Sequence, residues 1–138
     1  MITLHRVSPD QSALLLNVAP DVFDATIDPT RLDRYLEAPG HLLIVAVANG
    51  MVVGQIAGHV HLHVDAEPDL YVDNLGVGPA WQRQGIARRL LEDLLDWGRG
   101  HGCAQVWIVT ETENLAAQLL YRSSGLAQTD VVMFSRDG

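Results

Sequence analysis

A short segment around Gly85, residues 82–87, has the composition and position of a phosphate-binding turn. Gly85 follows an expected strand and precedes an expected helix. In that position backbone N–H groups converge on an anion, and the helix dipole adds partial positive charge. The spacing fits neither a P-loop, which ends in Gly-Lys-Ser/Thr, nor a three-glycine dinucleotide fingerprint. Taken alone, the glycine is equally compatible with an ordinary strand-to-helix turn.

A second group of residues that could carry chemistry consists of three alternating histidines, His59, His61 and His63. Alternation along a strand places all three on one face. One of them could act as a general base, or the His-x-His spacing could bind a metal ion. A metal site needs a further ligand and supporting contacts, so we expect polar residues on an exposed face and no metal.

The charge balance limits the class of partner. The chain carries 17 acidic and 9 basic residues, a formal net charge of -8. Nucleic-acid binding draws its affinity from clustered cations, so no nucleic-acid partner is expected. All nine basic residues are arginine, and Arg83, Arg88 and Arg89 crowd into one short segment. That segment therefore suits an anionic ligand.

Length and composition favour one globular domain over residues 1–138, with 48% hydrophobic residues to build its core. The single cysteine, Cys103, excludes an internal disulfide, and the N-terminal segment lacks the pattern of a signal peptide. No apolar run approaches the roughly 20 residues of a membrane span. We expect a soluble cytoplasmic protein with no membrane partner.

Turn and cap signals divide the chain into alternating elements. Ser8-Pro9 and Asp28-Pro29 each predict the start of a helix, and Asn49-Gly50 predicts a two-residue hairpin turn. Strands are expected at 3–7, on both sides of that turn within 41–64, and at 70–77, 105–110 and 131–134. Helices are expected from 9 to about 18, from 29 to about 38, from 86 and over 114–124. The predicted fold class is α/β, a mixed sheet with helices on both faces.

Two ordered motifs resemble those of the GNAT superfamily of N-acetyltransferases. The first runs Leu75-x-Val77-x-Pro79-x-x-Gln82-x-x-Gly85-Ile86-Ala87, followed by Leu90-Leu91. The second is Asn114-x-x-Ala117-x-x-Leu120-Tyr121, ending at Gly125. Together they cover about residues 70–125, and Ala87 departs from a glycine that is frequent in the family. The resemblance implies the GNAT fold, with a mostly antiparallel sheet splayed at the cofactor strand, and acetyl-CoA (coenzyme A) as cofactor.

The resemblance also implies which residues bind acetyl-CoA. The backbone of Leu75 and Val77 would pair with the pantetheine arm like an added strand. Residues 82–87 would hold the pyrophosphate, with Arg83 or Arg88 near the ribose phosphate. Asn114 would contact the pantetheine or cap its own helix. The full set is Leu75, Gly76, Val77, Gln82, Arg83, Gln84, Gly85, Ile86, Ala87, Arg88 and Asn114.

Two residues are the candidates for catalysis. Tyr121 of the second motif is expected to donate a proton or a hydrogen bond to the thiolate leaving group. The attacking amine must lose a proton, because a free alkyl amine has a pKa near ~10. Asp73 is the candidate base, acting through a water, and one of the three histidines is the alternative.

The acceptor is expected to be a polycationic small-molecule amine. Within the superfamily, residues 53–87 and the closing 131–134 run look most like aminoglycoside 3-N-acetyltransferases, which suggests a role in antibiotic resistance. Asn74 and Glu113-Asn114-Leu115 depart from that subgroup, so a polyamine, another amino sugar or a peptide amine are alternatives. A catalytically silent acyl-CoA-binding module is the alternative from another class, and a homodimer is possible. The predicted acceptor residues, which would attract a cation, are Asp21, Asp24, Asp28, Asn74, Glu111, Glu113 and Asp130.

Overall fold

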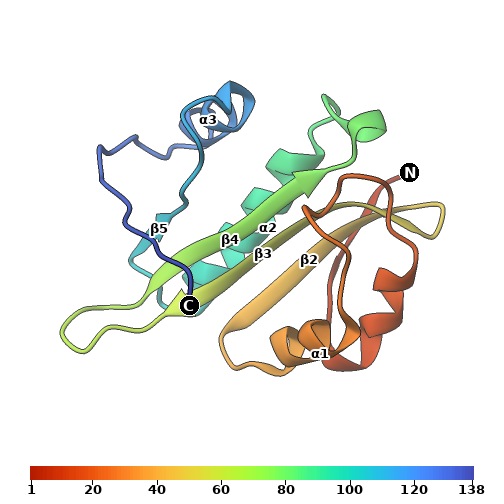
Figure 1. The fold of residues 1–138 in the computed structure, drawn as a ribbon, viewed down its shortest axis with the longest axis horizontal. Helices are drawn as coiled ribbons and strands as arrows, with labels where there is room; N and C mark the ends of the chain where they lie inside the picture. The colour runs from red at the N-terminus through yellow and green to blue at the C-terminus, as the bar shows by residue number, and fades with distance from the viewer.

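The computed structural model describes residues 1–138 and contains one five-stranded sheet in the order β1-β2-β3-β4-β5 (Figure 1). The first four strands pair antiparallel, and β5 lies parallel to β4. The elements are β1 (Thr3–Arg6), η1 (Pro9–Leu16), α1 (Pro29–Glu37), β2 (His41–Ala48), β3 (Met51–His61), β4 (Asp69–Val77), η2 (Pro79–Trp81), α2 (Ile86–Gly100), β5 (Gln105–Trp107) and α3 (Leu115–Ser123).

The hairpin between β2 and β3 sets the register of the sheet. Asn49 and Gly50 have φ angles of 51° and 75°, the left-handed values that a tight two-residue hairpin turn requires. The predicted hairpin is confirmed.

Helices cover both faces of the sheet. A Cβ on Gly54 would lie 3.2 Å from Ile86 of α2, whereas the side chain of the next residue, Gln55, reaches Val22 between η1 and α1. Successive residues of a strand point to opposite faces. Figure 1 shows α2 behind the sheet and the chain between η1 and α1 crossing its near face. The predicted mixed α/β fold is confirmed.

A large part of the core lies between α2 and the central strands. Ile86, Leu90, Leu91 and Leu94 of α2 are buried at helical spacing. Burying each such side chain stabilises the fold by about 1.5–3 kcal/mol. This packing holds α2 along the sheet and fixes the position of its N-terminus.

β4 and β5 pair over a short stretch and then separate. The parallel register joins residues 69–71 to residues 105–107 only, while β3 stays paired with β4 as far as Val77. The predicted strand at 105–110 therefore ends at Trp107. The edge of β4 beyond Tyr71 has no strand beside it, which confirms the expected splay.

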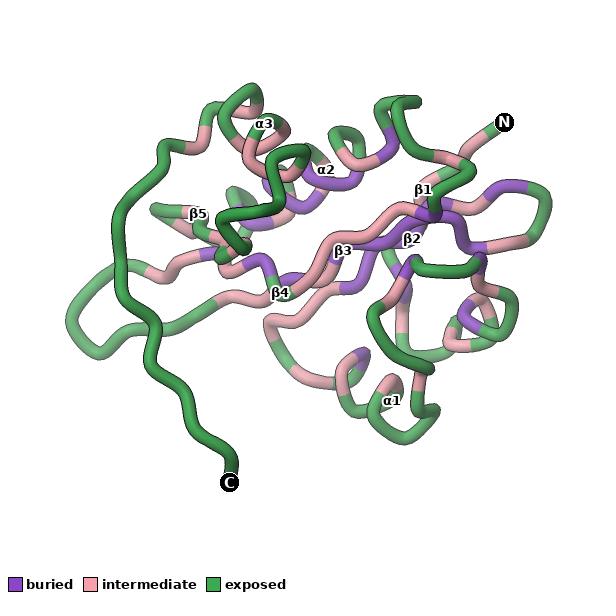
Figure 2. The backbone as a smooth tube through the Cα atoms, turned by 45° about the horizontal axis from the view of Figure 1, so that its top comes forward, coloured by how far each residue is buried: buried purple, intermediate pink, exposed green.

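The predicted closing strand at 131–134 is wrong. These residues have no regular secondary structure and lie exposed, with Phe134 at 90% (Figure 2). Four apolar residues favour a strand only when they pack against a neighbour, and this segment follows α3 without joining the sheet. The first expected helix also differs. It is a 3₁₀ helix that ends at Leu16, and Val18 forms a bridge with Val52 instead.

Within the helices, no segment has the length and apolar composition needed to span a membrane.

The loop between η1 and α1 approaches the backbone of β4 so closely that Gly76 has room for no side chain. A Cβ there would lie 2.2 Å from the carbonyl oxygen of Val22. We expect Gly76→Ala to lower the free energy of unfolding by about 1–3 kcal/mol, because the loop must move away. Urea unfolding measures the change.

Gly100→Ala is the matched control, because a Cβ at the last residue of α2 meets nothing within 4 Å. Equal unfolding free energies for the two variants would contradict the close packing at Gly76.

Candidate functional site

One large cavity opens where β4 and β5 separate. It has a volume of about 970 Å³ and is bounded by the second half of β4, the N-terminus of α2, residues 108–111 and α3. We call it the β4 cavity. Its walls come from segments far apart in the sequence, which the sheet brings together.

A β-bulge in β4 places two consecutive side chains on the same face. The register with β3 joins Ala57 to Asn74 but Gly58 to Val72, so Asp73 is the extra residue. Such bulges re-aim side chains. Both Asp73 and Asn74 line the β4 cavity.

Tyr35 and His59 hold the Asp73 carboxylate. Tyr35 Oη donates to Asp73 Oδ2 at 2.7 Å, and His59 Nδ1 lies 2.9 Å from Asp73 Oδ1. An ionised carboxylate only accepts hydrogen bonds, so His59 is the donor. Burial first, and then the bond to Asp73, raise the pKa of Tyr35 well above that of an ordinary phenol. Tyr35 therefore keeps its proton and stays a donor to Asp73.

The other predicted histidines lie farther along the sheet. His63 Nε2 is 2.8 Å from Asp69 Oδ2, and the His61 ring lies near Trp107. His41 of β2 stacks on His59 with ring centroids 5.0 Å apart. No three His, Cys, Asp or Glu side chains converge on a point that could hold a metal ion.

The N-terminus of α2 forms one end of the β4 cavity. Gly85 is its N-cap, with φ 78°, and open space surrounds the position that a Cβ would occupy. The first turn of a helix leaves backbone N–H groups without intrahelical partners. Glycine brings no capping side chain to these donors, and residues 85–88 line the β4 cavity, an arrangement that suits an anion.

Two arginines lie at the same end of the cavity. Arg83 and Arg88 both line it. Arg88 Nη2 also donates to Ser123 Oγ at 2.5 Å, and Nη1 lies 3.4 Å from Ser124 Oγ. Arg88 thus joins α2 to the end of α3 and adds positive charge near the open N–H groups.

Tyr121 reaches the cavity from α3 and is partly buried against the hydrophobic core. Burial raises the pKa of its phenol, so the hydroxyl stays protonated at neutral pH and can donate. Asn114 caps the same helix, accepting from the N–H of Ala117 at 3.1 Å, and also lines the cavity. The cap, one of two roles expected for Asn114, is therefore present.

The β4 cavity brings together most of the predicted site residues. Those that line it are Asp24, Asp73, Asn74, Leu75, Gly76, Val77, Gln82, Arg83, Gly85, Ile86, Ala87, Arg88, Glu111, Asn114 and Tyr121. Gln84 is not among its lining residues. Their roles in binding and catalysis stay predictions.

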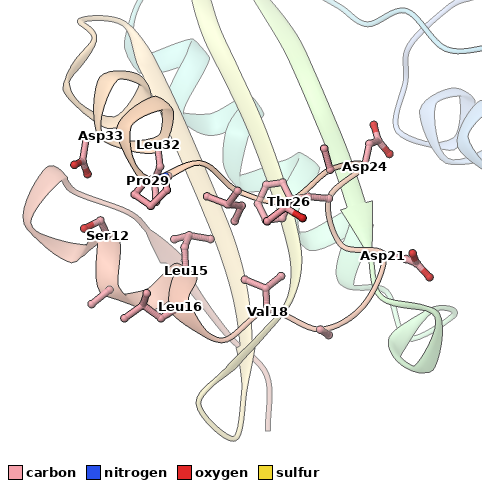
Figure 3. A pocket seen from close by; sticks show the side chains of 15 residues that line it. Ser12, Leu15, Leu16, Val18, Asp21, Asp24, Thr26, Pro29, Leu32 and Asp33 are labelled. Atoms are coloured by element: carbon pink, nitrogen blue, oxygen red, sulfur yellow. The ribbon is translucent and has the colours of Figure 1, made fainter.

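Four of the predicted acceptor residues lie elsewhere. Asp28 caps α1 by accepting from Arg31 N at 3.0 Å, and Glu113 and Asp130 are exposed outside this cavity. Asp21 lines a second cavity of about 820 Å³ between η1 and α1 (Figure 3). Asp24 lines both cavities and therefore stands between them.

Three residues near the β4 cavity were not predicted from the sequence. Tyr35 lies on the apolar stripe of α1, which signals core packing rather than a contact with Asp73. Trp81, within the first motif, lines the cavity. Gln55 is fully buried and bonds to Asn74. The available signal for Gln55 was a single polar residue in the apolar run of β3.

Comparison with known proteins identifies the family. The sequence profile of the Acetyltransferase (GNAT) family matches residues 12–126. The chain belongs to this GNAT family. One relative is the N-alpha-acetyltransferase RimI of Mycobacterium tuberculosis, 39% identical over 97 residues. That match covers 70% of this chain and 59% of the relative, so the chain spans less than two thirds of its length.

Other relatives of this GNAT chain are aminoglycoside N(6')-acetyltransferases. The type 1 enzyme of Stenotrophomonas maltophilia is 26% identical over 144 residues, 97% of this chain and 92% of the relative. The solved structure of AAC(6')-Iy with a bisubstrate analog of coenzyme A has a TM-score of 0.83 at 21% identity, covering 100% of this chain and 99% of that one. This structural likeness shows the fold.

Family membership confirms the predicted superfamily. At the level of the family it also confirms the predicted enzyme class, which is an acetyl-CoA-dependent N-acetyltransferase, and acetyl-CoA as the cofactor. The expected likeness to 3-N-acetyltransferases is not supported, because the aminoglycoside relatives carry the 6' designation. Homodimer formation stays a prediction.

Proposed function

We propose that this chain acetylates an amine of a cationic small molecule, an aminoglycoside, and that the 6'-amine rather than the 3-amine is the acceptor. The presence of both cationic and acidic residues in the lining of the β4 cavity carries the proposal. Arg83, Arg88 and the open N–H groups of α2 lie at one end, and Asp24, Asp73 and Glu111 also line the wall. Along β4, Asp73 and Val77 are about 13 Å apart.

The residues present fit acetyl-CoA. The unpaired edge of β4 beyond Tyr71 offers the backbone groups to which a pantetheine arm can bond. The open space at Gly85 lets a pyrophosphate approach the N–H groups of the α2 N-terminus. Bound there, acetyl-CoA supplies an activated thioester.

Two side chains handle the protons of the transfer. Asp73, held by Tyr35 and His59, accepts through a water the proton that the acceptor ammonium must lose before its nitrogen can attack the acetyl carbon. Tyr121, kept protonated by burial, donates a proton or a hydrogen bond to the sulfur as the C–S bond breaks. After the attack the nitrogen loses a second proton, which replaces the proton that Tyr121 gives to the thiolate. The proton taken up by Asp73 passes to solvent, so one proton is released overall and both side chains return to their starting states.

The carboxylates favour an acceptor with several positive charges. Asp24 and Glu111 lie on the cavity wall together with Asp73, and no ion pair joins either of the first two to an arginine. Carboxylates left without a cation attract a polycation. The 6' position is favoured because the aminoglycoside relatives are N(6')-acetyltransferases.

A second candidate acceptor is a peptide α-amine. It is favoured by the 39% identity to the mycobacterial N-alpha-acetyltransferase. A peptide N-terminus carries one positive charge, so it makes less use of the three carboxylates than an aminoglycoside does.

Thiol release from acetyl-CoA with kanamycin, spermidine, glucosamine and an N-terminal alanine peptide compares these acceptors directly. We expect the highest kcat/KM with kanamycin, because its charges match the carboxylates, and a 6'-N-acetyl product by NMR. Turnover of the peptide alone would reject the aminoglycoside. Tight acetyl-CoA binding without any turnover would instead favour a silent binding module.

Tyr121→Phe tests the proton donor. We expect kcat to fall about 100-fold, the usual contribution of a positioned acid, with little change in acetyl-CoA affinity measured by calorimetry. Tyr71→Phe, on the far side of the β4 bulge and paired with His59, is the matched control. An unchanged kcat in Tyr121→Phe would remove this residue from the mechanism.

Asp73→Asn tests the base. An amide cannot accept the proton, so we expect kcat to fall about 100-fold and the loss of activity toward low pH to disappear from the pH profile. His63→Gln, which alters a histidine bonded to Asp69 instead, should leave the profile unchanged. An acidic limb that survives in Asp73→Asn and vanishes in His59→Gln would assign the base to His59.

A further inference from the structure

Gln55 of β3 is the one polar residue that the fold buries completely. It lies between apolar neighbours, on the face of the sheet that meets the loop between η1 and α1. A buried amide is tolerated only when it is hydrogen-bonded. Its partners therefore show what the residue holds in place.

The partners determine the orientation of the Gln55 amide. Nε2 donates to the carbonyl oxygen of Val22 at 3.2 Å and to Asn74 Oδ1 at 2.5 Å. Val22 O can only accept, so nitrogen and not oxygen must face it. Gln55 Oε1 then has no hydrogen-bond partner in the protein. The orientation that allows Nε2 to donate to both Val22 O and Asn74 Oδ1 therefore leaves the buried Oε1 without a partner.

The chain of bonds continues to the wall of the β4 cavity. Because Asn74 accepts from Gln55 through Oδ1, its Nδ2 faces outward and lies 3.4 Å from Asp24 Oδ2. Asp24 stands between the two cavities. The same loop rests on Gly76, where only a missing side chain permits the contact with Val22.

We propose that Gln55 is a positioning residue that fixes the carboxylate of Asp24, through Asn74 and Val22, and thereby sets the affinity for a cationic acceptor. This inference rests on the proposed function, because it assigns Asp24 to acceptor binding. Gln55 itself touches neither substrate. Gln55 acts on the loop that carries Asp24, through Val22, and on the side-chain amide of Asn74, which faces Asp24.

An aspartate at position 74 would disturb this chain of bonds. A carboxylate there could still accept from Gln55 but would offer Asp24 only negative charge. The asparagine side chain can bond to both residues, because its oxygen accepts from Gln55 while its N–H₂ group donates to Asp24. Asn74 is therefore the link that the geometry requires.

Gln55→Met tests the inference, because methionine has a similar length and no donor. We expect KM for kanamycin to rise about tenfold, the effect of one lost positioning bond, with kcat and the Kd for acetyl-CoA unchanged. Gln105→Met, the same change at an exposed position of β5, should leave all three unaltered. An unchanged KM, or an equal loss of acetyl-CoA affinity, would overturn the proposal.

A double-mutant cycle identifies the route. If Gln55 acts through Asp24, adding Gln55→Met to Asp24→Asn should raise KM no further, whereas independent effects multiply. Multiplying effects would overturn the proposal. Should Gln55→Met fail to fold, Asn74→Ala interrupts the same chain at a half-exposed position.

Hydrogen exchange of the protein without substrates separates this inference from the proposed function. The amide of Ala19, which donates to Val52 O at 2.8 Å, and the amide of the buried Val22 should exchange at least tenfold faster in Gln55→Met than in Gln105→Met, because the loop loses its bond to Gln55. Equal exchange would overturn the positioning role even if kanamycin is a substrate. If kanamycin fails as a substrate, the KM cycle applies to whichever amine turns over.

Discussion

The separation of β4 from β5 is the constraint on which the site depends. β4 is paired on both edges only over its first three residues, and from Val72 onward one edge is open. Unpaired N–H and C=O groups inside a sheet are costly unless something satisfies them. α3 and residues 108–111 stand back from this edge and enclose the β4 cavity. The fold thus leaves a place for a ligand that completes the sheet.

The bulge at Asp73 gives the open edge its chemistry. Without it, Asp73 and Asn74 would point to opposite faces of the sheet. With it, Asp73 meets Tyr35 and His59, while Asn74 meets Gln55 and Asp24. One irregular residue therefore gives two adjacent positions of the same strand different partners, the proposed base Asp73 on one side and the proposed acceptor-binding group that begins at Asn74 on the other.

The two walls of the cavity differ in how they are attached. The loop between η1 and α1 is held by buried bonds and by close packing on Gly76. α3 is joined to α2 through the exposed Arg88, which bonds to the exposed Ser123 and the half-buried Ser124, and its Leu115 and Leu119 are exposed. The loop wall is thus held by buried contacts, whereas α3 is held by the packing of Leu120 and Tyr121 against the core and by more exposed bonds to α2.

The sequence by itself determined the order of the elements as far as α3, the hairpin at Asn49-Gly50, the α2 N-terminus at Gly85 and the family, because these follow from local φ angles, caps and contiguous motifs. It did not determine that 131–134 stays outside the sheet, since strand propensity is realised only against a partner. The contacts of Tyr35, His59 and Gln55 with the β4 residues were decided by the tertiary structure alone. Each depends on a bulge or on packing between segments 14 to 38 residues apart, and no local pattern in the sequence encodes either.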